Sequence, residues 1–232
     1  MREPETRPNR KLVLPFLLPY LVYTGIASIP GSWLAPAENY AVRLIATAAA
    51  LIYAWPHYPT LVGPRSLPTS IVLGTGAGAL GTVLWIALVS PFADSGATPS
   101  SPATIVLRLC AATLLVPVFE ELLMRGYLLR LVVQWDRARR GGSNDAIGEA
   151  LDRSSVLDVE PGAWTPVAVV VSTVLFAAGH GPEEWAAAVA YGGLMAGLWI
   201  VRGDLASCVV AHGVTNLALG AYVVSTDSWG IW

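Results

Sequence analysis

Apolar residues occur along this chain in long runs. A helix that crosses a lipid bilayer needs about 20 mostly apolar residues, and about seven stretches approach or exceed that length. Prolines, glycines and polar residues, which interrupt helices, separate these stretches. The pattern predicts the membrane-spanning segments Leu12–Ile29, Tyr40–Trp55, Ser70–Ser90, Ala103–Val133, Trp164–His180, Trp185–Val201 and Leu205–Ser225.

Composition supports a membrane protein. Of the 232 residues, 54% are hydrophobic and 13% are charged, and the mean hydropathy is +0.57, whereas an ordinary soluble domain carries about 25% charged residues. The two cysteines and the formal net charge of −2 argue against a disulfide scaffold and against a nucleic-acid partner. We therefore expect an all-α, polytopic transmembrane helix bundle in a lipid bilayer, with residues 1–232 forming a single integral membrane domain.

Lysine and arginine residues mark one side of the predicted bundle. They lie in the N-terminal tail, in the loop after the second segment and in residues 134–163 after the fourth segment, and the opposite loops contain none. Because cytoplasmic loops retain positive charge, this alternation predicts the N-terminus inside, the C-terminus outside and an odd number of spans. We expect residues 134–163 to form a cytoplasmic loop in which Gly141–Pro161 is a flexible excursion. A cleaved signal peptide is the alternative interpretation of Leu12–Ile29.

Several ionisable or strongly polar residues fall inside the predicted spans, where a charge costs about 2.5–3.5 kcal/mol on insertion scales. Such residues need partners, and a shared site in the interior of the bundle supplies them most simply. The residues are Arg108, Glu120, Glu121 and Arg125 in the fourth span, His180 at the end of the fifth, and His212 with Asn216 in the seventh.

The spacing of these residues predicts their directions. Glu121 and Arg125 are four positions apart, so they can pair on one face of a helix. Glu120 lies about 100° around the same helix and points elsewhere. His180 and His212 each have a companion four positions away: Phe176 precedes His180, and Asn216 follows His212.

Three kinds of chemistry are compatible with these residue types. Glu120 and a histidine can activate a water molecule for attack on a carbonyl, while a second histidine and an amide stabilise the oxyanion. A metal site is the second reading, because two histidines and a glutamate match a hydrolytic zinc set in ligand type. The third is a buried structural or ion-translocating network. No serine or cysteine lies in an evident activating motif, which disfavours a covalent mechanism.

Three short motifs resemble a known family. Glu120-Glu121-Leu-Leu-Met-Arg125 matches the pattern EExxxR, Phe176-Ala-Ala-Gly-His180 matches FxxxH, and His212-Gly-Val-Thr-Asn216 matches HxxxN. Their order and their placement on predicted membrane helices resemble the CPBP (CAAX protease and bacteriocin-processing, or ABI) family of intramembrane proteases. The resemblance covers about residues 107–219, and we expect a protease-like core at about 103–225.

The resemblance implies roles for individual residues. Glu120 and His180 would activate the hydrolytic water, and His212 and Asn216 would stabilise the oxyanion. Supporting parts would fall to Glu121, Arg125 and Phe176. It implies neither a cofactor nor a metal, and its substrate would be a protein or peptide cut near the membrane boundary.

Some members of that family are scaffolds or immunity factors, so a non-catalytic membrane factor is the alternative function. The C-terminal half also resembles CAAX-protease-related members linked to bacterial exosortase systems, which implies an exosortase-system partner. Thirteen arginines against one lysine suit a GC-rich bacterial gene, and we expect the bacterial inner (plasma) membrane. Prenylated substrates are not expected there.

Helical rise raises one difficulty. At 1.5 Å per residue, His180 lies about 24 Å from the cytoplasmic start of the fifth span, but His212 only about 10 Å from the start of the seventh. Either the fifth span begins below the membrane surface, or the turn at residues 179–182 lies inside the bundle.

Overall fold

The computed structural model describes residues 7–93 and 99–232. Part of the basic N-terminal tail, including Arg2, and part of the loop 91–102 lie outside the described residues. Each predicted span corresponds to a helix. The helices are α1 (Asn9–Ala27), α2 (Pro36–Ala54), α3 (Leu67–Val89), α4 (Pro102–Cys110), α5 (Val116–Glu121), α6 (Leu129–Arg140), α7 (Ala146–Gly148), α8 (Pro166–Ala178), α9 (Trp185–Arg202) and α10 (Leu205–Thr226).

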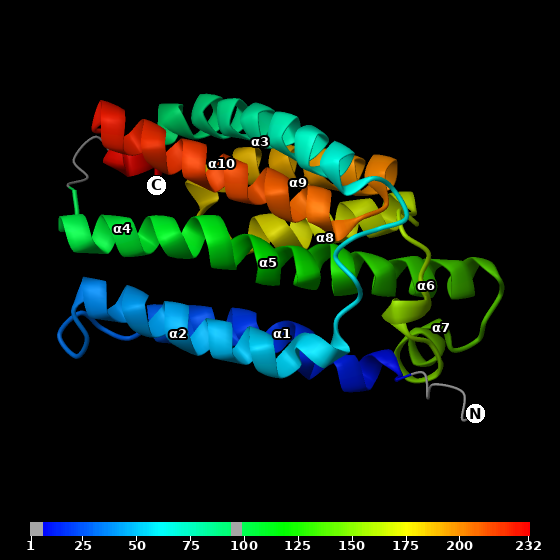
Figure 1. The fold of residues 1–232 in the computed structure, drawn as a ribbon. Coiled ribbons are helices and arrows are strands. Elements are labelled where there is room, and N and C mark those ends of the chain that lie inside the picture. The colour runs from blue at the N-terminus through cyan, green and yellow to red at the C-terminus, as the bar shows by residue number, and fades with distance from the viewer. Residues whose placement is uncertain (1–6, 94–98) are drawn as a thin grey trace.

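The helices form three layers (Figure 1). Helices α1 and α2 form one outer layer, α3, α9 and α10 form the other, and the run α4–α6 lies between them with α8 beside it. Helix α1 begins near the end of α6, whereas the C-terminal residues lie at the opposite end of the bundle. This arrangement agrees with an odd number of crossings and places the basic residues of α6 on the side where α1 begins.

Four helical segments among the described residues are long and apolar enough to cross a membrane: Leu67–Phe92, Pro102–Arg140, Pro182–Arg202 and Leu205–Thr226. Helix α8 is apolar but has only 13 residues. The protein is thus a polytopic helical membrane protein, and seven crossings stay a prediction. Helix α8 starts at Pro166, close to the predicted start of the fifth span, so both answers to the depth problem stay predictions.

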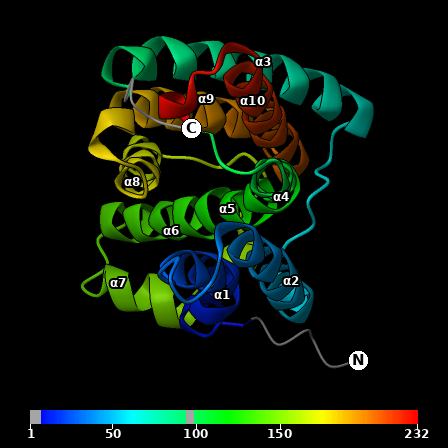
Figure 2. The same ribbon diagram turned by 90° about the vertical axis from the view of Figure 1, so that its left-hand side faces the viewer.

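The central run α4–α6 is continuous from Pro102 to Arg140 but is not uniformly α-helical. Two π-helical segments, Ala111–Leu115 and Leu122–Leu128, flank the six-residue α5. Figure 2 shows that the run bends, because α4 is viewed nearly end-on while α5 and α6 cross the view. π-Helical turns are a known cause of such bends and are frequent at functional sites.

Residues 134–163, predicted as a cytoplasmic loop, contain short helical segments. Helix α6 continues to Arg140, and the following segment packs against the start of α1. The buried Asn9 side chain donates to the Ala150 carbonyl (2.7 Å) and accepts from the Val156 backbone N–H (2.5 Å). These hydrogen bonds connect residues far apart in the sequence, so the composition of the segment does not reveal them.

Small residues on α3 let α10 approach closely. A Cβ added to Gly74 would meet the Ser207 carbonyl oxygen at 2.6 Å, and one added to Gly78 would meet the Ala211 carbonyl oxygen at 2.5 Å. Close backbone contact of this kind is a common basis of helix association in membranes. It fixes the position of α10, which carries His212 and Asn216.

Candidate active site

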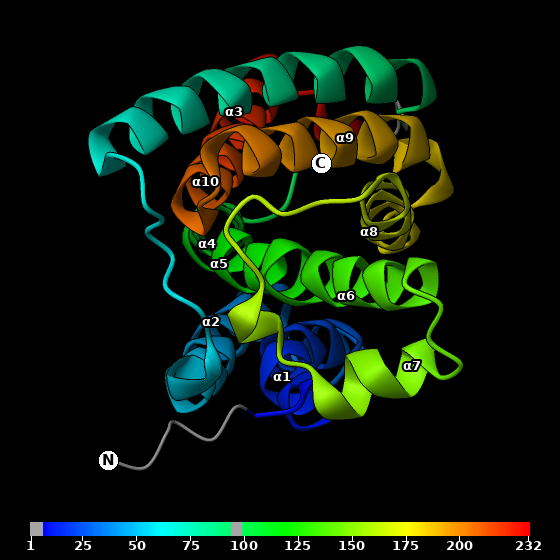
Figure 3. The ribbon, with the colours of Figure 1, turned by 90° about the vertical axis from the view of Figure 1, so that its right-hand side faces the viewer.

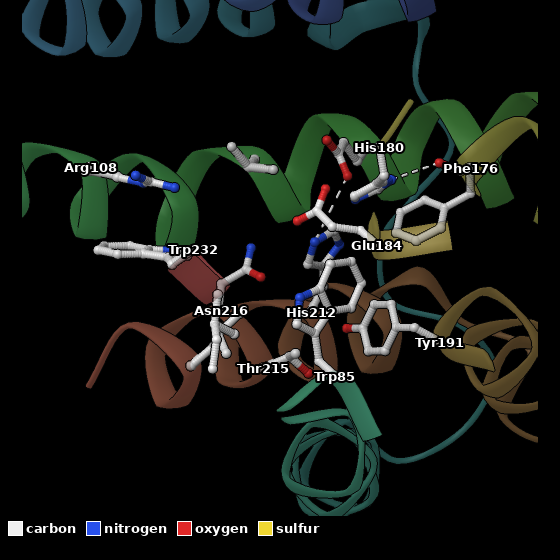
Figure 4. A pocket seen from close by; sticks show the side chains of 14 residues that line it. Trp85, Arg108, Phe176, His180, Glu184, Tyr191, His212, Thr215, Asn216 and Trp232 are labelled. Atoms are coloured by element: carbon white, nitrogen blue, oxygen red, sulfur yellow. Dashed lines mark hydrogen bonds and ion pairs between the residues drawn. The ribbon is translucent and has the colours of Figure 1, made fainter. Parts of the chain in front are cut away.

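Three segments far apart in the sequence bring the predicted residues to one cavity. Glu120 comes from α5, His180 follows α8, and His212 and Asn216 lie on α10. All four line a cavity of about 150 Å³ between the middle layer and the α3–α9–α10 layer. Figure 4 shows His180 and His212 pointing into the same space.

The two helices that supply the histidines start at defined caps. The Thr165 side chain accepts from the Ala168 backbone N–H (3.2 Å) at the start of α8, and Asp204 accepts from Ser207 (2.7 Å) at the start of α10. Such caps stabilise a helix start by about 1 kcal/mol. They fix where α8 and α10 begin, and His212 lies two turns into α10 whereas His180 follows the last residue of α8.

Glu121 forms the buried centre of the site. Its carboxylate lies 3.1 Å from Arg125 Nη1 and 2.9 Å from His212 Nδ1. Both Glu121 and Arg125 are almost completely inaccessible, with side-chain exposures of 0% and 1%. Arg125 also donates to the Gly192 carbonyl on α9 (3.2 Å). The pairing expected from the four-residue spacing is present, and it ties three elements together.

Glu120 faces the cavity instead. Its Oε2 lies 3.8 Å from His212 Nε2, which is within ion-pair range but too long for a hydrogen bond. Its side chain is 19% exposed, in contrast to the buried neighbour at 121. Two adjacent carboxylates therefore differ sharply in their surroundings, as their 100° separation around the helix predicts.

His180 is held by its own backbone and by aromatic rings. Its Nδ1 donates to the Phe176 carbonyl (2.8 Å), which leaves Nε2 with a lone pair. The His180 ring centroid lies 4.7 Å from that of Phe176 and 5.3 Å from that of Trp85. Phe176 therefore contacts His180 in two ways: its carbonyl oxygen accepts from Nδ1, and its ring packs against the imidazole.

The turn after His180 is also fixed. Trp185 Nε1 donates to the His180 carbonyl (3.1 Å), and the Gly181 N–H donates to the Glu184 carboxylate (3.0 Å). Glu184 itself lines the cavity. These bonds hold a non-helical segment against the cavity, where irregular backbone is tolerated in membrane proteins.

Asn216 closes the polar part of the cavity. One N–H of its side-chain amide donates to the Ala112 carbonyl, with a distance of 2.7 Å from Nδ2. Ala112 belongs to the π-helical segment Ala111–Leu115. Because a carboxamide has two N–H donors, this bond fixes the side chain and leaves one donor for a ligand.

Sequence reasoning missed several lining residues. Trp85, Tyr191 and Thr215 come from apolar or small-residue segments that gave no chemical signal. With Phe176 they enclose the histidines: the Tyr191 ring centroid lies 5.7 Å from that of His212. A wall of aromatic rings lowers the local dielectric, which strengthens charge interactions inside the cavity.

A metal site was the second reading of these residue types. Within residues 7–93 and 99–232, no three His, Cys, Asp or Glu side chains are arranged so that they could hold a metal ion. Glu121, the most buried carboxylate, is already paired with Arg125 and His212. The cavity is lined instead by the Glu120 carboxylate, by His180, whose Nε2 has no bond to the described residues, and by the Asn216 amide.

Comparison with known proteins gives a family. A family model described as type II CAAX prenyl endopeptidase, Rce1-like, matches residues 102–218, which is half of the chain. The matched range contains all three motifs and agrees with the resemblance to the CPBP family. No curated protein and no solved structure matches the chain. The chain therefore belongs to the Rce1-like family of CAAX proteases, which are membrane-bound hydrolases.

Proposed function

We propose that this protein is a glutamic intramembrane endopeptidase that hydrolyses a peptide bond of a protein or peptide substrate near the membrane boundary. The observation that carries the proposal is the meeting of the three motifs at one cavity, where the cavity-facing Glu120 and His180 lie beside His212 and Asn216. The Rce1-like family membership supplies the reaction class, peptide-bond hydrolysis.

In this mechanism, Glu120 is the general base. It accepts a proton from a water molecule, whose oxygen forms a bond to the carbonyl carbon of the scissile peptide. His180 Nε2 accepts a hydrogen bond from the same water and orients it, since Nδ1 already donates to Phe176. When the tetrahedral intermediate collapses, the C–N bond breaks and Glu120 returns the proton to the leaving amine.

His212 and Asn216 stabilise the oxyanion. The second Asn216 amide N–H and His212 Nε2–H donate to the negatively charged oxygen. If Nδ1 donates to the Glu121 carboxylate at the same time, His212 is an imidazolium ion. Glu121 then compensates its charge and fixes its ring, and Arg125 in turn balances Glu121. In this series of contacts, Glu121 and Arg125 have an electrostatic role: Glu121 balances the charge of His212, and Arg125 balances the charge of Glu121.

The experiment compares peptide cleavage by purified wild-type protein and by Glu120→Gln, read by mass spectrometry on a mixed peptide library. Glu120→Gln is nearly isosteric and removes the base, so we expect kcat/KM to fall about 10²- to 10⁴-fold with an unchanged unfolding temperature. His180→Ala should lose the same products. The chelator 1,10-phenanthroline should have no effect, because the mechanism uses no metal.

Other outcomes would overturn the proposal. If Glu120→Gln keeps the cleavage products, the glutamate is not the base. If the chelator abolishes them, the site is a metal centre. If the folded wild type cuts no peptide while Glu120→Gln keeps its physiological role, the protein is a non-catalytic scaffold or immunity factor.

The finer biological setting rests on the sequence alone. The bacterial inner membrane as location and an exosortase system as partner stay predictions from arginine content and family resemblance. The family name refers to CAAX substrates, and a protein substrate at the membrane follows from it. We propose no prenyl group on that substrate.

A further inference from the structure

An apolar groove lies apart from the candidate site, between α6 and the segment that follows it. Figure 3 shows α7 alongside α6, at the end of the bundle where α1 begins. Helix α6 and residues 146–153 border a groove of about 260 Å³. All six residues that line this groove are apolar, namely Leu131, Val132, Trp135, Ile147, Ala150 and Leu151.

One wall of the groove is an amphipathic turn. Ile147, Ala150 and Leu151 are three and four positions apart, so they can share one helical face. The acidic residues Glu149 and Asp152 alternate with them in the sequence. Ile147 is 63% exposed, although the segment is otherwise rich in polar residues. Exposed apolar side chains gathered beside polar ones mark a binding surface.

Positive charge lies at the end of this groove. The Arg139 Cζ lies 5.4 Å from the centroid of the Trp135 ring, which lines the groove. Arg139 and Arg140 each lie 3.0 Å from the buried carboxylate of Asp136. One carboxylate for two guanidinium groups leaves one positive charge in excess. Because both arginine side chains are more than half exposed, they keep N–H donors open to a ligand.

The order of apolar and basic positions along α6 matches a phospholipid. The groove residues of α6 end at Trp135, and Arg139 and Arg140 follow about 6 Å further along the helix axis. The distribution of basic residues predicts that this end of α6 is cytoplasmic. A phospholipid of that leaflet likewise has its acyl chains towards the bilayer interior and its phosphate at the surface. Anionic lipids are attracted to basic residues in this position.

We propose that the groove binds an anionic phospholipid of the cytoplasmic leaflet, with one acyl chain against its six apolar residues and the phosphate at Arg139 and Arg140. The excess positive charge favours an anionic lipid over a zwitterionic one. The bound lipid joins α6 to residues 146–153, and this segment also contacts α1 through the hydrogen bond of Asn9 with Ala150. The site is independent of the proposed protease activity.

The test measures lipid retention by native mass spectrometry. The full-length protein is purified in detergent, freed of co-purified lipid and titrated with phosphatidylglycerol or phosphatidylcholine of identical acyl chains. We expect the wild type to bind phosphatidylglycerol at least about fivefold more tightly, the gain typical of one basic residue near the membrane surface. Arg139→Gln should lose about this factor for phosphatidylglycerol and none for phosphatidylcholine. Arg139→Lys keeps the charge and should retain most of the preference.

Arg153 provides a matched control. It is also an arginine in an ion pair on this side of the bundle, with Asp145, and its side chain is 57% exposed against 54% for Arg139. It lies two positions after Leu151 and therefore does not share its helical face. Arg153→Gln should keep the wild-type preference. If it loses as much affinity as Arg139→Gln, or if the wild type binds both lipids equally, the proposal is wrong.

Ile147→Gln tests the acyl chain. Because Ile147 is largely exposed, the substitution should leave the unfolding temperature unchanged, but it should weaken the binding of both lipids about tenfold. Leu157→Gln is the control, since Leu157 is a partly exposed apolar residue of the same loop that does not line the groove. It should bind both lipids as the wild type does. Equal losses in the two variants would contradict an acyl chain in the groove.

The same spectra distinguish other occupants. Inorganic phosphate in large excess should not displace phosphatidylglycerol, because the acyl chain contributes to binding. If phosphate displaces the lipid, the arginines form a simple phosphate site and the proposal fails. If the spectra instead show a dimer that Ile147→Gln abolishes, a second copy of the chain covers the groove, and the proposal fails in that case as well.

Discussion

Two clusters of polar side chains in this protein each contain an arginine beside a carboxylate but have different surroundings. The candidate-site cluster contains Glu120, Glu121, Arg125 and His212, and two of its members, Glu120 and His212, line the cavity. The α9–α10 cluster joins the end of α9 to the starts of α10 and α3, and none of its members lines that cavity. It contains Ser70, Arg202, Asp204 and Ser207.

In the α9–α10 cluster, the polar groups bind mainly one another. Asp204 Oδ2 accepts from the Ser70 hydroxyl (2.7 Å), Asp204 Oδ1 accepts from the Ser207 backbone N–H (2.7 Å), and Arg202 donates to Ser70 Oγ (2.7 Å). Every bond joins groups of the protein itself. The cluster holds helix ends together, and none of its four residues lines the candidate-site cavity.

The candidate-site cluster lies at the edge of the cavity. Glu121 and Arg125 are closed off, but Glu120 and His212 Nε2 face the cavity at 3.8 Å from each other. Burial of charge in a membrane therefore does not identify a catalytic site by itself. The distinguishing property of the candidate site is that the Glu120 carboxylate and His212 Nε2 face a cavity, while Glu121 holds His212 through Nδ1.

Of the substitutions that test the difference between the two clusters, Glu121→Gln should have the largest effect, because it should lower both the stability of the fold and the rate of peptide cleavage. It leaves the buried Arg125 without a counter-charge, and breaking a buried ion pair costs about 3–5 kcal/mol of folding free energy. Under the proposed mechanism it also weakens the acceptor that orients His212 through Nδ1, so we expect kcat/KM to fall about 100-fold. Thermal unfolding and peptide cleavage by the folded fraction measure the two effects separately. A variant that loses activity at full stability would show that Glu121 acts only on chemistry.

Asp204→Asn should give the next largest effect, on stability alone. The amide keeps an oxygen for the Ser207 cap but leaves Arg202 uncompensated, and we expect a loss of about 3 kcal/mol. Activity per folded molecule should stay at the wild-type value. A selective loss of kcat in the folded fraction would contradict the division between the two clusters.

The exposed pair Arg10–Asp152 should give the smallest effect. The Arg10 guanidinium hydrogen-bonds to Asp152 (2.5 Å) and lowers the pKa of that carboxyl below its ordinary value. The pair therefore stabilises the fold above the unfolded-state pKa of about 3.9, and this contribution is lost as pH falls through the lower folded-state pKa. Because both side chains are largely exposed, the effect is small.

The pH dependence of unfolding checks this pair. The unfolding temperature of Asp152→Asn should lie slightly below that of the wild type at pH 6, and the two values should converge as pH falls towards 3. A constant difference across this range would show that the pair does not contribute through its charge.

The positions of the helices could be predicted from the sequence with small errors. The predicted span Trp185–Val201 compares with α9 at Trp185–Arg202, and Leu205–Ser225 compares with α10 at Leu205–Thr226. The length of an apolar run is a local property of the sequence, so it predicts the position of a helix without knowledge of the tertiary structure. The bend of the run α4–α6 was not predictable, since π-helical turns have no simple sequence pattern.

Part of the candidate site could also be predicted from the sequence. The four-residue spacing predicted the Glu121–Arg125 pair and the separate direction of Glu120, and the structure has both. The hydrogen bonds between helices could not be predicted from the sequence. Neither the 2.9 Å contact of His212 with Glu121 nor the bond of Asn216 to Ala112 follows from any spacing within a helix.

The sequence by itself determined the membrane class, the helix positions, the three motifs and the face on which each polar residue lies. These properties depend on hydropathy and on the fixed 3.6-residue turn, which act within one segment. Only the tertiary structure decided which charges are enclosed and which remain open, and it placed Trp85, Tyr191 and Arg108 around the same cavity. The reason is physical: enclosure depends on how helices distant in sequence pack, and that is set by contacts such as those of α10 with the glycines of α3.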